Sequence, residues 1–330
     1  MDKSILQLED IVDPVSEWID LSNEKLNRIA AREDSSLLGT VLGFTLGAPG
    51  KRLRPALVFL TSGMFGRLNT ETVDLAAATE CLHSATLIHD DMVDESSSRR
   101  GQDAVHVAWS SAAAVLSGDY LFAVSADLVA ELERPSIVRM FADTIMHMSR
   151  SEFESPGSSG DGTTMRQQYM SKIGGKTASL LALCCEAAAN LSGKSKDEQR
   201  CMRQYGTNLG LAFQIADDVL DVRGHIHLTG KPIGNDLRQG LLTLPIIHYL
   251  ENSVSSDSLV HSLIDGTLQP STSDIDDAIV ELEESGAVRE SLEIADKFAV
   301  RARAALEGLP QSEYTDALED LTYYVFNRIA

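Results

Sequence analysis

The 330-residue chain is short of aromatic and basic residues, and each shortage narrows its possible functions. Aromatic residues make up 5% of the sequence and apolar residues 43%, with many alanines and leucines, which favours helices over β-sandwiches or barrels. Only 28 lysines and arginines oppose 49 aspartates and glutamates, so the formal net charge is −21. Nucleic-acid binding requires basic surface, and no nucleic-acid partner is therefore expected.

Cysteines and long apolar runs are also scarce. The four cysteines, Cys81, Cys184, Cys185 and Cys201, lie in apolar helical stretches without the spacing of metal ligands, which predicts buried free thiols in a reducing compartment. The acidic stretch "MDKSILQLEDIVDPVSEWID" is typical neither of a secretory signal nor of a transit peptide. No apolar run reaches the length that spans a bilayer, so a cytoplasmic protein without a transmembrane segment is expected.

Helical periodicity is what the sequence has in abundance. Apolar residues return every three or four positions in stretches such as "PVSEWIDLSNEKLNRIAARE", "DLAAATECLHSATLIHDDMVD" and "YTDALEDLTYYVFNRIA". The turn-rich breaks are short and evenly spread, and no stretch alternates as a strand does. We expect an all-α fold in which residues 1–330 form one domain, a single large helical bundle around a central cavity. Such bundles build metal and ligand sites from side chains on facing helices.

Two acidic motifs share the spacing Asp-Asp-x-x-Asp, and each closes an apolar helical stretch. The first lies in "HSATLIHDDMVDESSSRRG" and the second in "FQIADDVLD". Their aspartates are Asp90, Asp91 and Asp94, and Asp217, Asp218 and Asp221. Residues four apart share a face of a helix, so each motif presents a pair of carboxylates to one side. Two such helices facing one another would line a cavity with negative charge.

Carboxylates gathered in this way repel one another unless cations bind between them. Oxygen ligands favour Mg²⁺, which proteins usually hold with one or two carboxylates together with substrate phosphates. An EF-hand calcium loop does not fit, because its ligands alternate around a glycine and end in glutamate. One such motif in so acidic a chain is more often a solvated helix end, whereas two copies at equivalent places favour a function.

Several of the few basic residues lie at turns close to the acidic helices. They are Lys51, Arg52 and Arg54 after "GAPG", Arg99 and Arg100 after the first motif, Lys176 with Thr177 in "GGKTASL", and Lys231 in "TGKPIGND". Arginine clamps phosphate with two hydrogen bonds, and lysine supplies a point charge. Each alone resembles an ordinary surface charge. As a set they predict a site for two phosphate-rich ligands, one held through Mg²⁺ and one held directly.

These motifs together resemble those of the trans-isoprenyl diphosphate synthases, also called polyprenyl synthetases. The resemblance spans nearly the whole chain and includes "GKRLRP", the first aspartate motif, "VLSGDYLF", "KTASLL", the second aspartate motif, "GKPIGNDL" and "TLP", in the order of the family. It implies the all-α isoprenoid synthase fold and a transferase that joins isopentenyl diphosphate to an allylic diphosphate. It also implies a homodimer, and transient membrane contact when the product is released.

The resemblance implies a role for each matching residue. The metal ligands, which would hold three Mg²⁺ ions on the allylic diphosphate, are Asp90, Asp94 and Asp217. The aspartates that would act directly or through metal-bound water are Asp91, Asp218 and Asp221. The side chains that would contact the same diphosphate are Arg99, Lys176 and Lys231. Those that would hold isopentenyl diphosphate are Lys51, Arg54, His83 and Arg100. Thr177 and Gln214 would direct their dipoles at the developing allylic cation.

The expected chemistry suits these residue types. The allylic diphosphate ionises to a carbocation and pyrophosphate, and Mg²⁺ with cationic side chains stabilises the leaving charge. The π bond of isopentenyl diphosphate then attacks the cation, and a proton is lost to pyrophosphate, so no catalytic His or Glu is required. His83 taken alone is an ordinary helix histidine bonded to a neighbour. Its predicted role depends on its place in the motif, two turns before Asp90.

Residues just before the first motif bear on product length, because in this family bulky side chains there close the tunnel in which the product grows. Here Ala85 and Thr86 are small, and the two-residue insertion of many short-chain bacterial enzymes is missing. Helix geometry places Thr86 near the Asp90 side and turns Ala85 away, so the role of Ala85 rests on the resemblance. Phe141 is either a deeper tunnel floor or a core aromatic. We expect an all-trans product of roughly C30–C50 by family analogy.

The sequence also departs from the family pattern at a few positions. In "SRSEFES" Ser151 replaces a glycine and Ser155 a glutamine, Leu241 stands where many members have lysine, and "GAPG" replaces a paired glycine. None of these changes removes an expected metal ligand. The alternatives are a short-chain farnesyl or geranylgeranyl synthase and an inactive partner subunit of a heteromeric synthase, although such subunits typically lose aspartates. A terpene cyclase would lack the set of residues expected to bind isopentenyl diphosphate.

Overall fold

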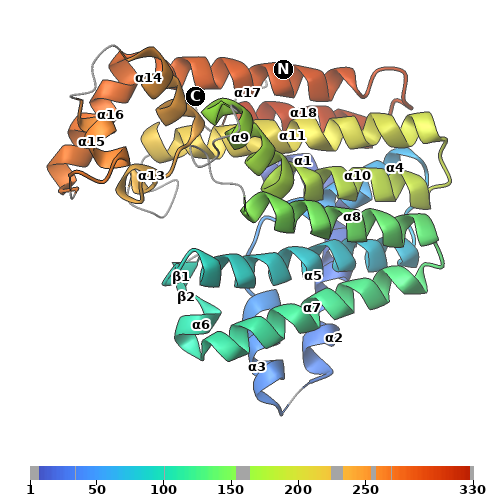
Figure 1. Ribbon diagram of the computed structural model, residues 1–330. Coiled ribbons are helices and arrows are strands. Elements are labelled where there is room, and N and C mark those ends of the chain that lie inside the picture. Colours follow the sequence, from blue (N-terminus) through green and yellow to red (C-terminus); the bar gives the residue numbers. More distant parts are fainter. Residues whose placement is uncertain are drawn as a thin grey trace.

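The computed structural model describes residues 7–33, 35–99, 101–153, 164–223, 233–253, 258–268 and 270–327. Almost all of its regular structure is helical (Figure 1). The helices are α1 (Leu8–Val12), η2 (Asp13–Val15), α2 (Ser16–Ala31), α3 (Leu37–Leu46), α4 (Leu53–Met64), α5 (Thr70–Val93), α6 (Val105–Ala108), α7 (Ser111–Glu131), α8 (Pro135–Glu152), α9 (Met165–Ile173), η3 (Gly174–Ala178), α10 (Ser179–Leu191), α11 (Lys196–Arg223), α13 (Asn235–Arg238), α14 (Leu244–Asn252), α15 (Leu259–Ile264), α16 (Thr272–Glu284), α17 (Ala287–Ala304) and α18 (Glu313–Asn327). The predicted all-α fold is confirmed.

The expectation that the chain forms no strand is wrong at one place. Strands β1 (Ser98–Arg99) and β2 (Gln102–Asp103) pair antiparallel directly after α5. Each strand has two residues, too few for an alternating pattern to be read in the sequence. Gly101 follows the first strand with φ +77°, a left-handed conformation that glycine adopts without steric cost. The hairpin turns the chain back towards the bundle and brings Arg99 beside the end of α5.

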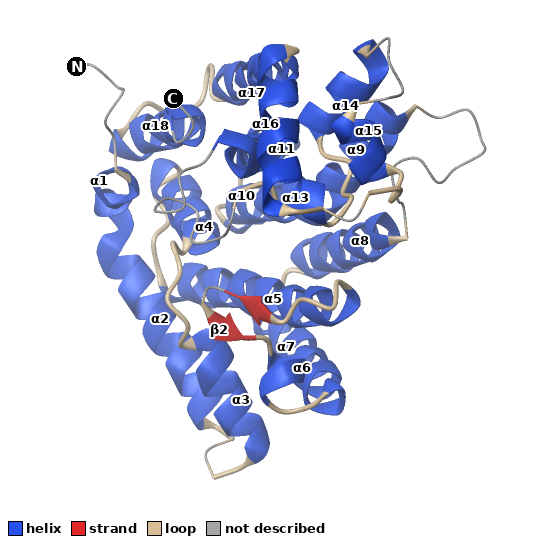
Figure 2. Ribbon diagram, turned by 90° about the vertical axis from the view of Figure 1, so that its left-hand side faces the viewer, coloured by secondary structure: helices blue, strands red, loops and turns tan. Residues whose placement is uncertain are grey.

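Long helices lie side by side in the bundle, because their apolar faces are buried against one another. The main apolar cluster lies between α2, α4, α5, α7, α10, α11 and α18, with fully buried Leu57, Leu82 and Tyr205 among its members. A second cluster packs the end of α11 against α13 to α17 and includes Val219 and Val288. Helices α5 and α11 end at the same side of the bundle, on the left in Figure 1 and towards the viewer in Figure 2.

One helix tests the expectation that no segment could cross a membrane. Helix α7 is long and apolar enough to do so by length and composition alone, so that expectation is wrong for Ser111–Glu131. The helix nevertheless runs beside α5 and buries Leu121 and Leu128 in the main cluster. A helix packed in this way satisfies the same test without a membrane, and we assign α7 to the core of the bundle.

The cysteines are free thiols, as expected. Burial raises the pKa of Cys81 and Cys184 to about 12, and it also raises the pKa of Cys185. Thiols with raised pKa values are poor nucleophiles and poor metal ligands. Cys201 is only half-buried, because it lies near the start of α11, outside the most tightly packed part of the bundle.

Candidate active site

The first aspartate motif lies in the last turn of α5. An Asn69–Thr72 capping box starts this helix, and it ends at Val93. The carbonyl ends of a helix carry partial negative charge, so carboxylates there are destabilised unless a cation is near. The second motif lies in the same unfavourable position, close to the end of α11. Both motifs therefore need positive charge, which is a physical reason to expect cations at this side of the bundle.

Lys176 supplies such a charge to the first motif. Its Nζ lies 3.4 Å from Asp90 Oδ2, 3.7 Å from Asp94 Oδ2 and 3.2 Å from Glu152 Oε1. Burial alone would lower the pKa of Lys176, but the three carboxylates raise it above its ordinary value. Burial raises the pKa of Asp90, and Lys176 opposes that shift. As the shared helix face predicted, Asp90 and Asp94 act together on one cation.

Asp91 points to another face of α5 and pairs with Arg99. Arg99 Nε and Nη2 both lie 2.6 Å from Asp91 Oδ1, and Asp91 is only 5% exposed. Burial raises the pKa of Asp91, while the guanidinium lowers it. The short hairpin thus fixes an arginine beside the motif. Arg100, the next predicted ligand, lies outside the described residues.

The aspartates of the second motif have three different environments. Asp217 borders a cavity that Asp91 also lines. Asp218 is buried, and burial raises its pKa to about 7 although hydrogen bonds from Tyr169 and Gln214 lower it. Asp221 accepts hydrogen bonds from the backbone nitrogens of Asn235 and Asp236, at 3.2 and 2.8 Å. In this arrangement Asp221 holds the start of α13.

Thr177 and Gln214, which were predicted to share a role, are in direct contact. Thr177 Oγ1 donates to Gln214 Oε1 (2.7 Å), and Gln214 Nε2 donates to Asp218 Oδ1 (2.9 Å). Tyr169 donates from its hydroxyl to Asp218 Oδ2 (2.5 Å). Thr177 lies in the π-helical turn η3, a feature that often marks functional sites. The glycines of α11 allow the close approach, since a Cβ on Gly210 would lie 2.5 Å from Ala178 Cα.

A cavity of about 520 Å³ opens between these elements. It contains most of the residues that were predicted to bind isopentenyl diphosphate, together with groups of both aspartate motifs. Its lining includes Lys51, Arg54, His83, Asp91, Arg99, Thr177 and Asp217. Residues from distant parts of the sequence therefore meet in one cavity with both basic and acidic walls. Lys231 lies outside the described residues.

Two neighbouring basic residues in the turn before α4, Lys51 and Arg52, have different hydrogen-bond partners. Arg52 has left-handed backbone (φ 46°), and its guanidinium donates to Asn23 Oδ1 and to the Leu46 carbonyl, both at 2.8 Å. Lys51 Nζ instead donates to the Tyr324 hydroxyl at 3.0 Å. The hydrogen bonds of Arg52 thus hold the turn, whereas Lys51 contacts Tyr324 in α18.

Three residues of this region were missed in the sequence. Glu80 is a carboxylate with 4% exposure that lines the cavity one turn before His83 on α5, so the helical stripe could have suggested it. Tyr169 and Tyr324 come from α9 and α18, and their contacts depend on helix packing. Nothing in their local sequence marks either tyrosine.

The residues proposed to set product length do not line this cavity. Ala85 is fully buried, Thr86 is half-buried with its hydroxyl donating to the His83 carbonyl, and Phe141 is 3% exposed within the main apolar cluster. Leu87 and Ile88 border the cavity instead. The chain-length roles of Ala85, Thr86 and Phe141 stay predictions.

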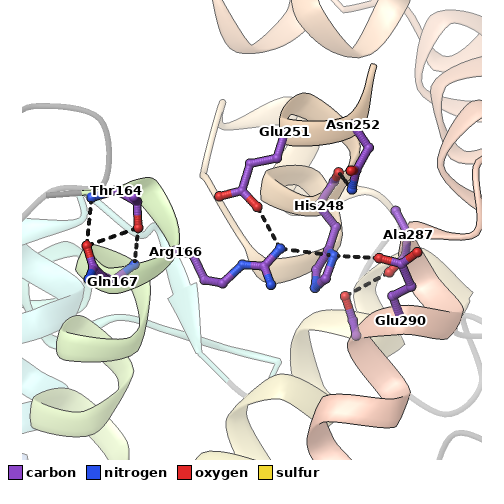
Figure 3. Close-up of polar contacts among 9 residues, drawn as sticks. Thr164, Arg166, Gln167, His248, Glu251, Asn252, Ala287 and Glu290 are labelled. Atoms are coloured by element: carbon purple, nitrogen blue, oxygen red, sulfur yellow. Dashed lines mark hydrogen bonds and ion pairs between the residues drawn. The ribbon is translucent and has the colours of Figure 1, made fainter. Parts of the chain in front are cut away.

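A second polar cluster lies away from this cavity, between α9, α14 and α17 (Figure 3). His248 Nδ1 lies 3.3 Å from Arg166 Nη2 and 2.9 Å from Glu290 Oε2, and Arg166 also pairs with Glu251 at 2.6 Å. Burial lowers the pKa of His248, and the neighbouring Arg166 lowers it further. The cluster ties three helices together and includes no predicted site residue.

The aspartate motifs have the right chemistry for a divalent cation, although they are not gathered into a finished site. Among the described residues, no three His, Cys, Asp or Glu side chains converge as a metal site. The donors are nevertheless all carboxylate oxygens, which suit Mg²⁺ or Ca²⁺. The Lys176 ammonium already lies between Asp90 and Asp94, so this pair accommodates positive charge. The donor set therefore fits the predicted ion.

Sequence comparison relates the chain to known enzymes. The sequence profile of the Polyprenyl synthetase family matches residues 35–282. The chain is 34% identical to solanesyl-diphosphate synthase 2, chloroplastic, from Oryza sativa subsp. japonica, over 98% of this chain and 80% of that protein. It is also 34% identical to heptaprenyl diphosphate synthase component 2 from Geobacillus stearothermophilus, over 92% and 94% of the two chains.

Solved structures share the fold over almost their whole length. The polyprenyl synthase from Caulobacter crescentus CB15, solved in complex with calcium and isoprenyl diphosphate, superposes with a TM-score of 0.89 at 32% identity and 98% coverage of both chains. The geranylgeranyl pyrophosphate synthetase from Pyrococcus horikoshii Ot3 gives 0.87 at 28% identity, covering 96% of this chain and 98% of that one.

Proposed function

The chain belongs to the polyprenyl synthetase family and is a prenyltransferase, and we propose that it joins isopentenyl diphosphate to an allylic diphosphate to make a medium- or long-chain all-trans polyprenyl diphosphate. The observation that carries this proposal is the cavity where Lys51, Arg54 and His83 meet groups of both aspartate motifs. The names of the solanesyl and heptaprenyl relatives support a long product. The alternative is a short product, as in the geranylgeranyl relative.

Each site residue has a proposed part in this reaction. The residues proposed as metal ligands are Asp90, Asp94 and Asp217, and those proposed to contact the allylic diphosphate are Arg99, Lys176 and Lys231. Isopentenyl diphosphate is assigned to Lys51, Arg54, His83 and Arg100. Divalent cations, which we propose to be three Mg²⁺ ions, would neutralise the diphosphate and favour its departure. Lys176 and Arg99, already beside the aspartates, would hold the departing pyrophosphate by direct hydrogen bonds.

Neighbouring carboxylates hold two of the basic side chains that are proposed to bind the allylic diphosphate. Arg99 and Lys176 are paired with carboxylates at 2.6 to 3.7 Å. When a diphosphate and its cations bind, the carboxylates gain metal ligands and the basic groups gain phosphate oxygens. The exchange leaves no charge unpaired, so the cost of desolvating the site is offset by new contacts.

We also propose a homodimer in the cytoplasm. Exposed apolar side chains lie on neighbouring helices α7 and α8: Val115, Leu116, Val138 and Met146. Apolar groups repeated along two helices favour burial against a second copy. The relative called component 2 makes a heteromer the alternative. Light scattering of the purified chain distinguishes a dimer from a monomer that needs a partner. The free thiols support a reducing compartment, and cell fractionation tests the location.

The decisive experiment is an elongation assay. Purified protein is incubated with Mg²⁺, isopentenyl diphosphate and farnesyl diphosphate, and the dephosphorylated products are separated by chain length. We expect a ladder that ends well beyond the geranylgeranyl product, and loss of all elongation in Asp90→Ala. A product that stops at the geranylgeranyl length would support the short-chain alternative. Absence of elongation with every allylic primer would make the chain an inactive partner subunit.

A product-length variant follows from the same assay. By family analogy a bulky residue just before the first motif closes the tunnel, so we expect Ala85→Tyr to shorten the product. Because Ala85 is fully buried, a thermal melt must first show that the variant folds. Thr86→Ser is the control, since it keeps a small side chain before the first motif and should leave the product length unchanged. Ala78→Tyr is less suitable as a control, because Ala78 is also fully buried. An unchanged product in Ala85→Tyr would assign chain length to other residues.

A further inference from the structure

A chain of hydrogen bonds that converges on Asp218 links α9 to the wall of the cavity. Tyr169 donates to Asp218, Gln214 donates to the other oxygen of Asp218, and Thr177 donates to Gln214, at 2.5, 2.9 and 2.7 Å. Tyr169 and Asp218 are 3% and 6% exposed, so solvent does not compete for these bonds. The four residues come from α9, α11 and η3, and only helix packing brings them together.

The Asp218 carboxylate, which accepts from both sides, sets the direction of the bonds that lead to Thr177. The Oδ1 atom of Asp218 accepts from Gln214, and only the amide nitrogen of Gln214 can donate to it. The amide oxygen of Gln214 must then face Thr177, which has a single hydroxyl proton and uses it for this contact. The lone pairs of Thr177 Oγ1 are left for the cavity, which Thr177 lines.

We propose that Tyr169 is a positioning residue that fixes this direction, so that the Thr177 oxygen presents its negative end to the developing allylic cation. Tyr169 occupies Oδ2 of Asp218 and leaves Oδ1 for Gln214. Without the phenol, the carboxyl group turns freely and Gln214 loses its fixed orientation. The inference rests on the proposed function for the identity of the cation. It assigns a role to Tyr169, which is not part of the cavity wall. It also gives a reason why Asp218 is buried.

The substitution Tyr169→Phe tests the inference, because it removes one hydroxyl and keeps the ring. The probe is an aza analogue of the allylic chain, a protonated amine that mimics the cation, compared with its uncharged carbon counterpart. Calorimetry with Mg²⁺ and pyrophosphate gives the affinity of both. We expect Tyr169→Phe to weaken the cationic probe about tenfold and to leave the neutral probe unchanged. The effect is smaller than the roughly hundredfold loss of a group that touches the reacting charge, because Tyr169 acts through Asp218 and Gln214. This readout needs no turnover.

Tyr205→Phe is the matched control. Tyr205 is fully buried and donates to the Leu318 carbonyl at 2.7 Å, so its loss removes a buried hydroxyl of the same kind far from the chain of bonds. Both variants should lower the melting temperature, and only Tyr169→Phe should reduce the preference for the cationic probe. Equal effects of the two variants on the two probes would overturn the inference and leave Tyr169 a packing residue.

A double-mutant cycle separates positioning from independent damage. In a Gln214→Leu background nothing remains for Asp218 to orient, so adding Tyr169→Phe should not weaken the cationic probe further. Losses that multiply would contradict the inference. Elongation by the wild-type chain is a separate measurement: its failure would refute the proposed function, whereas the ratio of the two affinities would still decide the role of Tyr169.

Discussion

The middle aspartates of the two motifs have the same place in an identical spacing, yet they meet different partners. Asp91 pairs with Arg99 from the hairpin, whereas Asp218 accepts from Tyr169 and Gln214. Spacing along a helix predicts which face a side chain takes, and Asp90 and Asp94 do lie on one face, where both are close to the Lys176 ammonium. It says nothing about what another helix brings to that face, so the tyrosines stayed unpredicted.

His248 is a residue-scale case in which the environment predicts a measurable pH effect (Figure 3). Its pKa in the folded chain is below the ordinary 6.5, so the unfolded chain binds the proton more readily. Stability contributed by neutral His248 is therefore complete above pH 6.5 and is lost as the pH falls below it. The groups around the ring are Arg166, Glu251 and Glu290. We expect His248→Gln to reduce the fall in melting temperature between pH 8 and pH 5.5.

The control for this prediction is the exposed His147. His147→Gln removes a histidine that is not buried, so the melting temperature of this variant should change with pH as that of the wild type does. If His248→Gln keeps the full pH dependence of the wild type, acid destabilisation arises elsewhere, and the cluster in Figure 3 is a simple tie between helices.

At the scale of elements, apolar periodicity predicted the long helices and placed both motifs at helix ends. Apolar periodicity could not predict two features of the site. The hairpin of β1 and β2 is too short to have a period, and the π turn η3 interrupts a helix by its hydrogen-bond pattern alone. Both position basic residues, Arg99 and Lys176. The elements that position the side chains proposed to bind phosphate are thus the ones that periodicity detects least well.

Packing of η3 against α8 explains how the chain accommodates one departure from the family pattern. Ser151 is 2% exposed, and a Cβ on Gly175 would lie 2.4 Å from the Cβ of Ser151. Gly175→Ala should therefore displace η3, with Lys176, and destabilise the fold by about 1–3 kcal/mol, as overpacking does. It should also weaken pyrophosphate binding. Thermal melts and calorimetry with Mg²⁺ and pyrophosphate measure both effects.

Two further substitutions, at Ser151 and at Gly174, test whether the contact between Gly175 and Ser151 causes the predicted effect. Ser151→Gly removes the obstructing atoms, so Ser151→Gly/Gly175→Ala should recover most of the stability and binding that Gly175→Ala loses. Gly174 has helical backbone with no atom within 4 Å of its added Cβ, so Gly174→Ala should be tolerated. Failure of the double variant to recover would show that Ser151 is not what constrains the turn.

For the whole molecule, composition and pattern were enough to predict an all-α bundle, and the fold is confirmed. The arrangement of helices that forms the site depends on the combined effect of many packing contacts. Three apolar clusters set how α5, α11 and η3 approach, and no local stretch encodes those distances. The close approaches at Gly175 and Gly210 are readable only once the partners Ser151 and Ala178 are known.

The clusters also predict how the molecule responds to metal. The fold is held by buried apolar side chains, whereas the carboxylates of both motifs lie at helix ends beside the cavity. Chelation alone should therefore leave the melting temperature unchanged, unlike a domain built around a structural metal. Mg²⁺ and pyrophosphate together should raise the melting temperature, because they bind only the folded chain. The free energy of unfolding should increase by about 2.7 kcal/mol when the ligand is at 100 times its dissociation constant. Asp90→Asn should abolish most of this gain, since it removes a ligand beside Lys176, while the exposed Asp127→Asn should keep it. A large stabilisation by Mg²⁺ without pyrophosphate would contradict the account, because among the described residues no three His, Cys, Asp or Glu side chains converge as a metal site.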